Sequence, residues 1–323
     1  MKYNIVLIGA GNIGSRHLQG LKKVNFPLNI TVVDPSSQSL NVAKDRWEQI
    51  ASSVKHHIIF NTYLNSVSPT IDLAIIATNS NIRRKAIEEL LSKSALRYLI
   101  LEKLLFQKKE DYFVVDKLLK KKKVKAWVNC SMRVTPFYSN LKKKVKDKKI
   151  ICLVNGSQYG FITNSIHFID YVTYLSDIDD FTLDTTLLDK KPINSKRMGF
   201  LEFNGTLIAY FKNGSVGIFN CYPIGKAPIV VEIISRDLLA MANESNRKTW
   251  VALPPEGNWQ ESKEMLAYQS DITNLVVEKI LKAGKCDLPS YQQSSKLHLT
   301  LLEGLRDHLN QTSIKKYDYY PFT

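Results

Sequence analysis

A glycine-rich turn near the N-terminus constrains the fold of this chain most. The apolar run from Ile5 to Ile8 predicts a buried parallel strand, and a helical pattern through Leu18 and Leu21 follows the turn. The glycines stand at G-x-G-x-x-G spacing, which allows a tight turn, a close approach to a pyrophosphate and close packing of helix on sheet. The motif predicts a dinucleotide at the helix N-terminus, held by Gly9, Gly11, Asn12, Ile13 and Gly14.

An acidic residue, Asp34, ends the second strand-like run, twenty residues after Gly14. A carboxylate at this position can accept hydrogen bonds from both hydroxyls of an adenine ribose, and it would repel a 2'-phosphate. The cofactor predicted is therefore NAD, with NADP less favoured, although Arg16, Lys22 or Lys23 could approach a phosphate from elsewhere. A glycine-rich turn without a nucleotide is the other interpretation.

The length of 323 residues is enough for two domains. No apolar run has the length of a membrane span, and the N-terminal apolar run is too short for a signal peptide, so we expect a cytoplasmic protein with no membrane partner. The four cysteines are scattered without metal-ligand spacing, so neither a disulfide framework nor a metal site is expected.

The net charge of +15 raises the question of nucleic-acid binding. Its densest lysine clusters, at 120–125 and 142–149, lie where helices are expected to end, and cations are favourable there. Neither cluster is interleaved with aromatic residues as a base-stacking surface would be. We interpret them as solvated faces and expect no nucleic-acid partner, while attraction of an anionic substrate stays open.

Strand and helix signals alternate through the first part of the chain, which predicts a doubly wound parallel sheet over residues 1–128. The ends of its strands, at Gly9, Asp34, Thr78 and Glu102, should share the edge where ligands bind. Residues 129–285 predict an α+β domain with a mostly antiparallel open sheet. Asn-Gly pairs at 204–205 and 213–214 mark hairpins in it, and a helix from about 262 to 283 ends it. Residues 286–323 predict a helical segment that packs back on the first domain.

Several motifs in order resemble the Gfo/Idh/MocA family of nicotinamide-dependent oxidoreductases. Beyond the glycine motif and Asp34, they are the segment 72–79, the pair Glu102-Lys103, the segment 129–136, and His167-Phe168-Ile169-Asp170. The resemblance implies that Thr78, Asn79 and Glu102 contact the cofactor and that Lys103 reaches the substrate hydroxyl. The family usually has proline after Glu-Lys, whereas this chain has Leu104, which removes a rigid backbone element.

The resemblance also implies a substrate side. His167 and Asp170 lie three residues apart on an expected helix and can share a face. They are the predicted catalytic partners of Lys103, and with Arg133 and Asn164 they would bind substrate; Arg133 could instead fasten the two domains. The family often has aspartate and glycine before the histidine, where this chain has Thr163 and Ser165.

The activity that this resemblance implies is hydride transfer between NAD and a secondary alcohol of a sugar, sugar acid, cyclitol or nucleotide sugar. A homodimer or homotetramer is expected from the family alone. Other activities on the fold stay open, namely reduction of linear tetrapyrroles and NAD-dependent glycosidase activity. A catalytically inactive NAD-binding or sensor protein, or a nucleic-acid binder with this fold, is the alternative of another class. Arg83 or Arg84 lies where the family often has histidine, and either could be a solvated helix cation.

Overall fold

In a computed structural model, which describes residues 2–145, 148–254, 256–264 and 266–323, the chain divides into two units. The first comprises residues 1–131 and 267–292, and the second comprises residues 132–266 and 293–323. Both units are α/β in content, so the expected fold class is confirmed.

The first unit contains a six-stranded parallel sheet in the order β3-β2-β1-β4-β5-β6. Strand β1 is central, and Ile5 to Ile8 are buried because helices cover both faces. This is the doubly wound arrangement that the sequence predicts. The strands are β1 (Tyr3–Ile8), β2 (Leu28–Val33), β3 (His57–Asn61), β4 (Thr70–Ile76), β5 (Ala95–Leu101) and β6 (Lys125–Val128).

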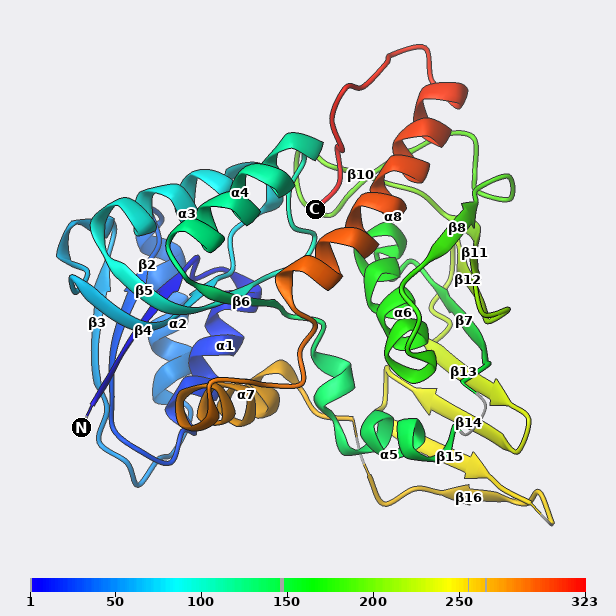
Figure 1. Cartoon of the computed structure of the whole chain (residues 1–323), viewed down its shortest axis with the longest axis horizontal. Helices are drawn as coiled ribbons and strands as arrows, with labels where there is room; N and C mark the ends of the chain where they lie inside the picture. Colours follow the sequence, from blue (N-terminus) through cyan, green and yellow to red (C-terminus); the bar gives the residue numbers. More distant parts are fainter. Residues whose placement is uncertain (1, 146–147, 255, 265) are drawn as a thin grey trace. The chain divides into compact units, whose positions relative to one another are not determined.

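Helices lie on both sides of this sheet (Figure 1). One side carries α1 (Asn12–Lys22), α2 (Ser37–Glu48) and α7 (Gln269–Ala283), and the other carries α3 (Ser80–Lys93) and α4 (Lys109–Lys121). A short helix, η1 (Leu64–Ser66), stands between β3 and β4. The turns after β1, β2, β4 and β5 all lie at the carboxyl edge of the sheet, where open parallel sheets bind ligands.

The second unit contains an eight-stranded sheet in the order β16-β15-β14-β13-β7-β12-β11-β8. Neighbouring strands are antiparallel except for β7 and β12, which are parallel, so the sheet is mixed and mostly antiparallel as expected. Its strands are β7 (Ile151–Ser157), β8 (Phe181–Asp184), β11 (Gly205–Phe211), β12 (Val216–Tyr222), β13 (Val230–Ser235), β14 (Leu238–Asn243), β15 (Lys248–Ala252) and β16 (Trp259–Glu261). A separate pair is formed by β9 (Ile193–Asn194) and β10 (Leu201–Glu202).

Helices cover one face of the mixed sheet, namely α5 (Pro136–Lys144), α6 (Phe161–Ser176) and the part of α8 (Tyr291–Thr312) that belongs to this unit (Figure 1). Along β11, Leu207, Ala209 and Phe211 are buried on the helix side, and the residues between them face away. This alternation is typical of a sheet with one covered face. The short helix η2 (Ser131–Val134) precedes α5.

The units differ from the expected domains in two places. Helix α7 belongs to the first unit, because it packs along α1 and its Gln269 and Thr273 hydrogen-bond to His17. From residue 293 onward the last helix belongs to the second unit. Helix α7 also begins later than the expected residue 262, because residues 259–261 form the edge strand β16.

The two Asn-Gly pairs have different structures. The pair at 213–214 makes the turn between the paired strands β11 and β12, as predicted. At 204–205 the hairpin prediction is wrong, because β10 pairs with β9 and not with β11. Glycine is required there for another reason: Gly205 has a φ of +102°, and a Cβ would lie 2.5 Å from the carbonyl oxygen of Leu187.

Among the described helices, none has the length and apolar character needed to cross a membrane.

Candidate functional site

The glycine turn has the backbone geometry that a dinucleotide site needs. Gly9 has a φ of +93°, which L side chains rarely adopt, and turns the chain out of β1. A Cβ on Gly14 would lie 1.8 Å from the carbonyl oxygen of Gly9, so only glycine lets α1 begin this close to the strand. These two positions explain why the motif needs glycine for its own fold.

The N-terminus of α1 fits a pyrophosphate. No side chain caps it, and its first turn carries no acidic residue, so its N–H groups and the helix dipole favour an anion. Gly11 and Asn12 are exposed there, and a Cβ on Gly11 would meet no atom within 4 Å. The open space beside Gly11 suits the close approach of a phosphate group to the backbone.

Asp34 follows β2 directly and orders the same turn. One of its oxygens accepts from the Ala10 N–H at 2.7 Å, and the other accepts from the Ser36 N–H at 2.9 Å. A carboxylate has about four lone-pair sites, so acceptor capacity remains for ribose hydroxyls. Asp34 is half-buried, which leaves it accessible to a ligand at this edge.

Thr78 and Asn79 follow β4 at the same edge. Asn79 is exposed at the N-terminus of α3, which no side chain caps. The Thr78 hydroxyl oxygen is buried, and no described residue forms a hydrogen bond with it. A buried hydroxyl without a protein partner is costly, so it fits a group that a bound cofactor would satisfy.

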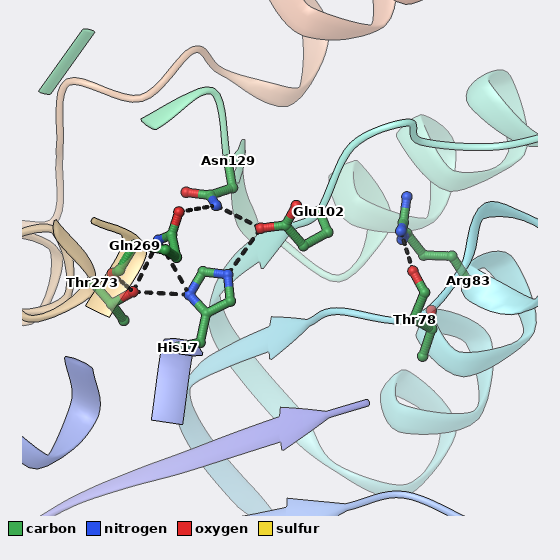
Figure 2. A network of polar contacts seen from close by, with 7 residues as sticks. All are labelled: His17, Thr78, Arg83, Glu102, Asn129, Gln269 and Thr273. Carbon is green, nitrogen blue, oxygen red and sulfur yellow. Dashed lines mark hydrogen bonds and ion pairs between the residues drawn. The ribbon is translucent and has the colours of Figure 1, made fainter. Parts of the chain in front are cut away.

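Glu102 directly follows β5 and lies in a buried network that joins four segments of the first unit (Figure 2). Its Oε1 accepts from His17 Nε2 at 2.9 Å and from Asn129 Nδ2 at 2.5 Å. On the other side of the imidazole, Nδ1 lies 2.9 Å from Thr273 Oγ1 and 3.5 Å from Gln269 Nε2. The network therefore links the cofactor helix α1 to the strand end that carries Glu102.

The charge of Glu102 is stabilised in this network. Burial raises the pKa of the carboxyl, but the hydrogen bond and charge of His17, with smaller effects of Lys103 and Asn129, outweigh it and hold the pKa at about 2. Glu102 is therefore ionised at neutral pH, so His17 Nε2 donates to it. Lys103, the next residue, is half-buried.

Arg83 is buried and bonded to backbone carbonyls (Figure 2), whereas Arg84 lies near the surface. The Arg83 guanidinium donates to the carbonyl oxygens of Thr78, Leu104 and Leu105, the last at 2.9 Å. Arg84 pairs with Glu88 and Asp111. Of the two arginines, Arg84 is the solvated helix cation, and Arg83 is part of the site's framework.

Arg133 and Asp170 form a buried ion pair in the second unit. Arg133 Nε donates to one carboxylate oxygen at 2.8 Å, and Nη2 donates to the other. Arg133 also stacks on the Tyr174 ring and lines a cavity of about 200 Å³ with Gln293. Burial raises the pKa of Asp170, and the charge and hydrogen bonds of Arg133 lower it in part. Both oxygens of Asp170 are thus committed to Arg133.

His167 and Asn164 lie on the same helix, α6, which also carries Asp170. The His167 ring is half-buried. Asn164 is half-buried too, and its Nδ2 donates to the Tyr159 carbonyl at 2.7 Å. Just before them, the N–H groups of Ile162 and Thr163 donate to the buried carboxylate of Glu202, which satisfies the start of α6.

Within the first unit, the structure brings the predicted cofactor residues together at one edge. Those residues are Gly9, Gly11, Asn12, Ile13, Gly14, Asp34, Thr78, Asn79 and Glu102. The sequence did not reveal His17 or Arg83 as framework residues, and Thr273 and Gln269 were missed altogether. A signal for His17 existed, because it sits beside Leu18 on the apolar part of α1.

Nowhere in the described parts of the chain do three or more histidine, cysteine or acidic side chains gather as a metal ion would require.

A comparison with models of known protein families finds a match within the first unit. Residues 3–130 match the model of the Gfo/Idh/MocA oxidoreductase family, described as an NAD-binding Rossmann fold. These residues therefore resemble the NAD-binding Rossmann domain of this family, as the motifs lead us to expect. No curated protein sequence matches the chain.

Solved structures share the fold along nearly the whole chain at low identity. An oxidoreductase from Agrobacterium radiobacter, crystallised with NAD+, L-tartaric acid and magnesium, is 15% identical with a TM-score of 0.72, covering 97% of this chain and 98% of its own. UDP-N-acetylglucosamine 3-dehydrogenase GnnA from Acidithiobacillus ferrooxidans is 12% identical with a TM-score of 0.71, covering 94% and 96%. A super-repressor mutant of Gal80p from Saccharomyces cerevisiae is 15% identical with a TM-score of 0.68, covering 97% of each chain. The fold is thus shared by enzymes and by a protein crystallised as a super-repressor mutant.

Proposed function

We propose that this protein is an NAD-dependent oxidoreductase that transfers a hydride between nicotinamide and a secondary alcohol of a sugar, sugar acid, cyclitol or nucleotide sugar. One observation carries the proposal. The edge of the Rossmann sheet combines an uncapped α1 N-terminus and Asp34 with an ionised, buried Glu102, and Lys103 follows Glu102 directly. A dinucleotide site with an adjoining lysine suits alcohol oxidation, which needs a base for the hydroxyl proton.

NAD, when bound, supplies the acceptor or donor of the hydride. We propose that Gly11, Asn12 and Ile13 hold its pyrophosphate, that Asp34 binds the adenine ribose, and that Thr78 satisfies its hydroxyl on the bound cofactor. Support for this comes from the open space beside Gly11 and the buried Thr78 oxygen. The other contacts follow the resemblance, namely Gly9, Gly14, Asn79 and Glu102.

For proton transfer we propose Lys103 as the acid/base, with His167 assisting it. In alcohol oxidation, the Lys103 amine in its neutral form takes the hydroxyl proton as the carbinol carbon gives up hydride. We propose that Arg133 and Asn164 bind substrate. For Asp170 we propose an indirect role: it orients Arg133, because it is only 1% exposed and pairs with that guanidinium through both oxygens.

Two observations bear on the substrate class. The net charge of +15 favours attraction of an anionic compound. One enzyme of the same fold acts on a nucleotide sugar, UDP-N-acetylglucosamine. Within the proposed class we therefore favour sugar acids and nucleotide sugars over neutral polyols.

The test is a panel of sugars, sugar acids, cyclitols and nucleotide sugars, assayed for NAD reduction together with thermal shift. The proposal predicts that at least one member gives NADH at a rate proportional to enzyme. Cleavage of a glycoside with no net NADH would instead indicate a glycosidase. Stabilisation by NAD with no turnover of any member would contradict the dehydrogenase proposal.

A non-catalytic NAD-binding protein is the second candidate function. The specific observation in its favour is that Asp170, expected beside the substrate, is closed off in an ion pair with Arg133. The fold also serves a protein described as a super-repressor mutant. NAD binding that changes the affinity of the full chain for another macromolecule, without turnover, would support this candidate.

We also propose that the protein forms a homodimer, or a tetramer built from such dimers, through the uncovered face of the mixed sheet. The face away from α6 carries apolar side chains in adjacent register, with Leu153 opposite Ile218 and Ile218 opposite Ile208. Apolar residues that adjoin one another on an uncovered face can mark an interaction site. Light scattering should give a dimer or tetramer for the wild type and a monomer for Ile218→Glu. A monomeric wild type would contradict this proposal.

A further inference from the structure

Arg83 is a charged side chain in an unusual position. It is the fourth residue of α3 and only 1% exposed. Burying a guanidinium is costly unless its donors are bonded. Its neighbour Arg84 can reach solvent and uses two carboxylates instead. A side chain held inside at this cost indicates that the groups it bonds matter to the fold or to the site.

The groups that Arg83 bonds belong to two segments at the ligand edge. Nη1 donates to the carbonyl oxygens of Leu104 and Leu105, and Nη2 donates to the carbonyl oxygen of Thr78 (Figure 2 draws the contact with Thr78). The segment with Leu104 and Leu105 continues directly from Lys103. The segment with Thr78 contains the proposed cofactor contact. One guanidinium therefore fastens both segments to α3.

The backbone of the loop after Lys103 requires a constraint from outside the loop. A proline after Glu-Lys would fix one backbone dihedral of the loop, and Leu104 does not. Glu102, on the near side of Lys103, is already fixed by His17 and Asn129. On the far side, the carbonyls of Leu104 and Leu105 are held by Arg83. The backbone of Lys103 is thus fixed from both sides.

We propose that Arg83 is a positioning residue that supplies, through its carbonyl hydrogen bonds, the constraint that a proline at position 104 would supply, and so aims Lys103. The inference rests on the proposed function, in which Lys103 is the acid/base. Lysine has a long flexible side chain, so its aim depends on its backbone. A displacement of about 1 Å can cost about 100-fold in rate.

The first test compares Arg83→Met with Arg84→Met, a matched control one residue along the same helix. Hydrogen exchange followed by mass spectrometry should show residues 103–106 exchanging at least about 10-fold faster in Arg83→Met, with distant peptides unchanged. Arg84→Met should stay within about twofold of wild type. Unchanged exchange in Arg83→Met would overturn the proposal. This measurement needs no substrate, so it remains decisive if no substrate of the panel is turned over.

The second test uses turnover of a substrate found by the panel. Arg83→Met should lower kcat by about 100-fold while the KM for substrate changes much less, because proton transfer is affected more than binding. Arg83→Lys keeps the charge but not the planar guanidinium with its several donors, so its kcat should lie between those of wild type and Arg83→Met. It also serves as the folded variant if Arg83→Met does not fold. Equal losses of kcat in Arg84→Met and Arg83→Met would contradict a specific role of Arg83.

The third test is rescue. Within the described residues, the Leu104 N–H has no acceptor, so Leu104→Pro removes no hydrogen bond. In the Arg83→Lys background, Leu104→Pro should slow exchange of residues 103–106 and restore at least about 10-fold of the lost kcat. Slower exchange without recovery of kcat would show that the loop is held but does not aim Lys103, and would overturn the proposal.

Discussion

Replacing His17 with phenylalanine should destabilise the first unit by about 3 kcal/mol near pH 7. Phenylalanine fills the space of the imidazole but donates no hydrogen bond to Glu102. The pKa of Glu102 is about 2 in the fold, against an ordinary 4.5. At about 1.36 kcal/mol per pKa unit, this difference corresponds to about 3 kcal/mol of stability. Loss of one partner of a buried pair is known to cost a similar amount, about 3–5 kcal/mol.

The stability lost in His17→Phe should depend on pH. A carboxyl whose folded pKa is lowered contributes stability above its unfolded pKa, and the contribution disappears as the pH falls from 4.5 toward about 2. Without His17, burial of Glu102 dominates and the folded pKa rises above 4.5. Glu102 in the variant then takes up a proton on mild acidification, so the difference between wild type and His17→Phe should shrink between pH 7 and pH 4.

The assay is urea unfolding followed by tryptophan fluorescence. Trp47 and Trp127 lie in the first unit, so a background with Trp250→Phe and Trp259→Phe reports that unit alone. A double-mutant cycle with Glu102→Gln should give a coupling energy of about 2–3 kcal/mol. His57→Phe, at an exposed histidine of the same unit, is the control and should change stability by less than about 0.5 kcal/mol. A loss of stability below about 1 kcal/mol in His17→Phe, or a loss independent of pH, would show that His17 does not stabilise the charge of Glu102.

Three further outcomes are expected. Gly14→Ala places a Cβ 1.8 Å from the Gly9 carbonyl oxygen, so calorimetry should show loss of NAD binding by at least about 10-fold, and unchanged affinity would contradict the turn geometry. Asp34→Ser should weaken the binding of NAD about 10-fold and reduce the ratio of NAD affinity to NADP affinity, whereas Asp34→Glu should keep the preference for NAD. Burial raises the pKa of Glu244 to about 7, so this group makes the fold less stable as pH rises from 4.5 to about 7. Glu244→Gln should increase the free energy of unfolding of the second unit by about 1 kcal/mol at pH 8. A decrease of the same size at every pH would be inconsistent with this prediction.

The fold of the first unit was predictable because its signals are local. The buried run at Ile5, the spacing of Gly9, Gly11 and Gly14, and the acid at Asp34 are each encoded within a few residues of the sequence. Parallel strands with helices between them then bring their carboxyl ends to one edge, so the cofactor residues could be grouped without coordinates.

The framework of the site was not predictable because it depends on contacts between distant residues. His17 is close to Glu102 only because the fold brings α1 to the residue that follows β5, and Thr273 is more than 250 residues further along the chain than His17. Arg83 does stand at the helical spacing of the buried residues Ile87, Leu90 and Leu91, which is a sequence signal for its burial, but the carbonyl groups that it bonds could not be predicted. The Asn-Gly pair at 204–205 failed as a hairpin marker because the close approach of Leu187 also requires a glycine.

In the reaction that we propose, Lys103 moves the proton of an NAD-dependent alcohol oxidation. The direct measurement is turnover and NAD affinity of Lys103→Met beside wild type, with Lys108→Met as a control at an exposed lysine of the same unit. We predict that Lys103→Met loses at least about 1,000-fold in kcat while its Kd for NAD stays within about threefold of wild type. Substantial residual turnover by Lys103→Met would contradict the role of Lys103 as the acid/base.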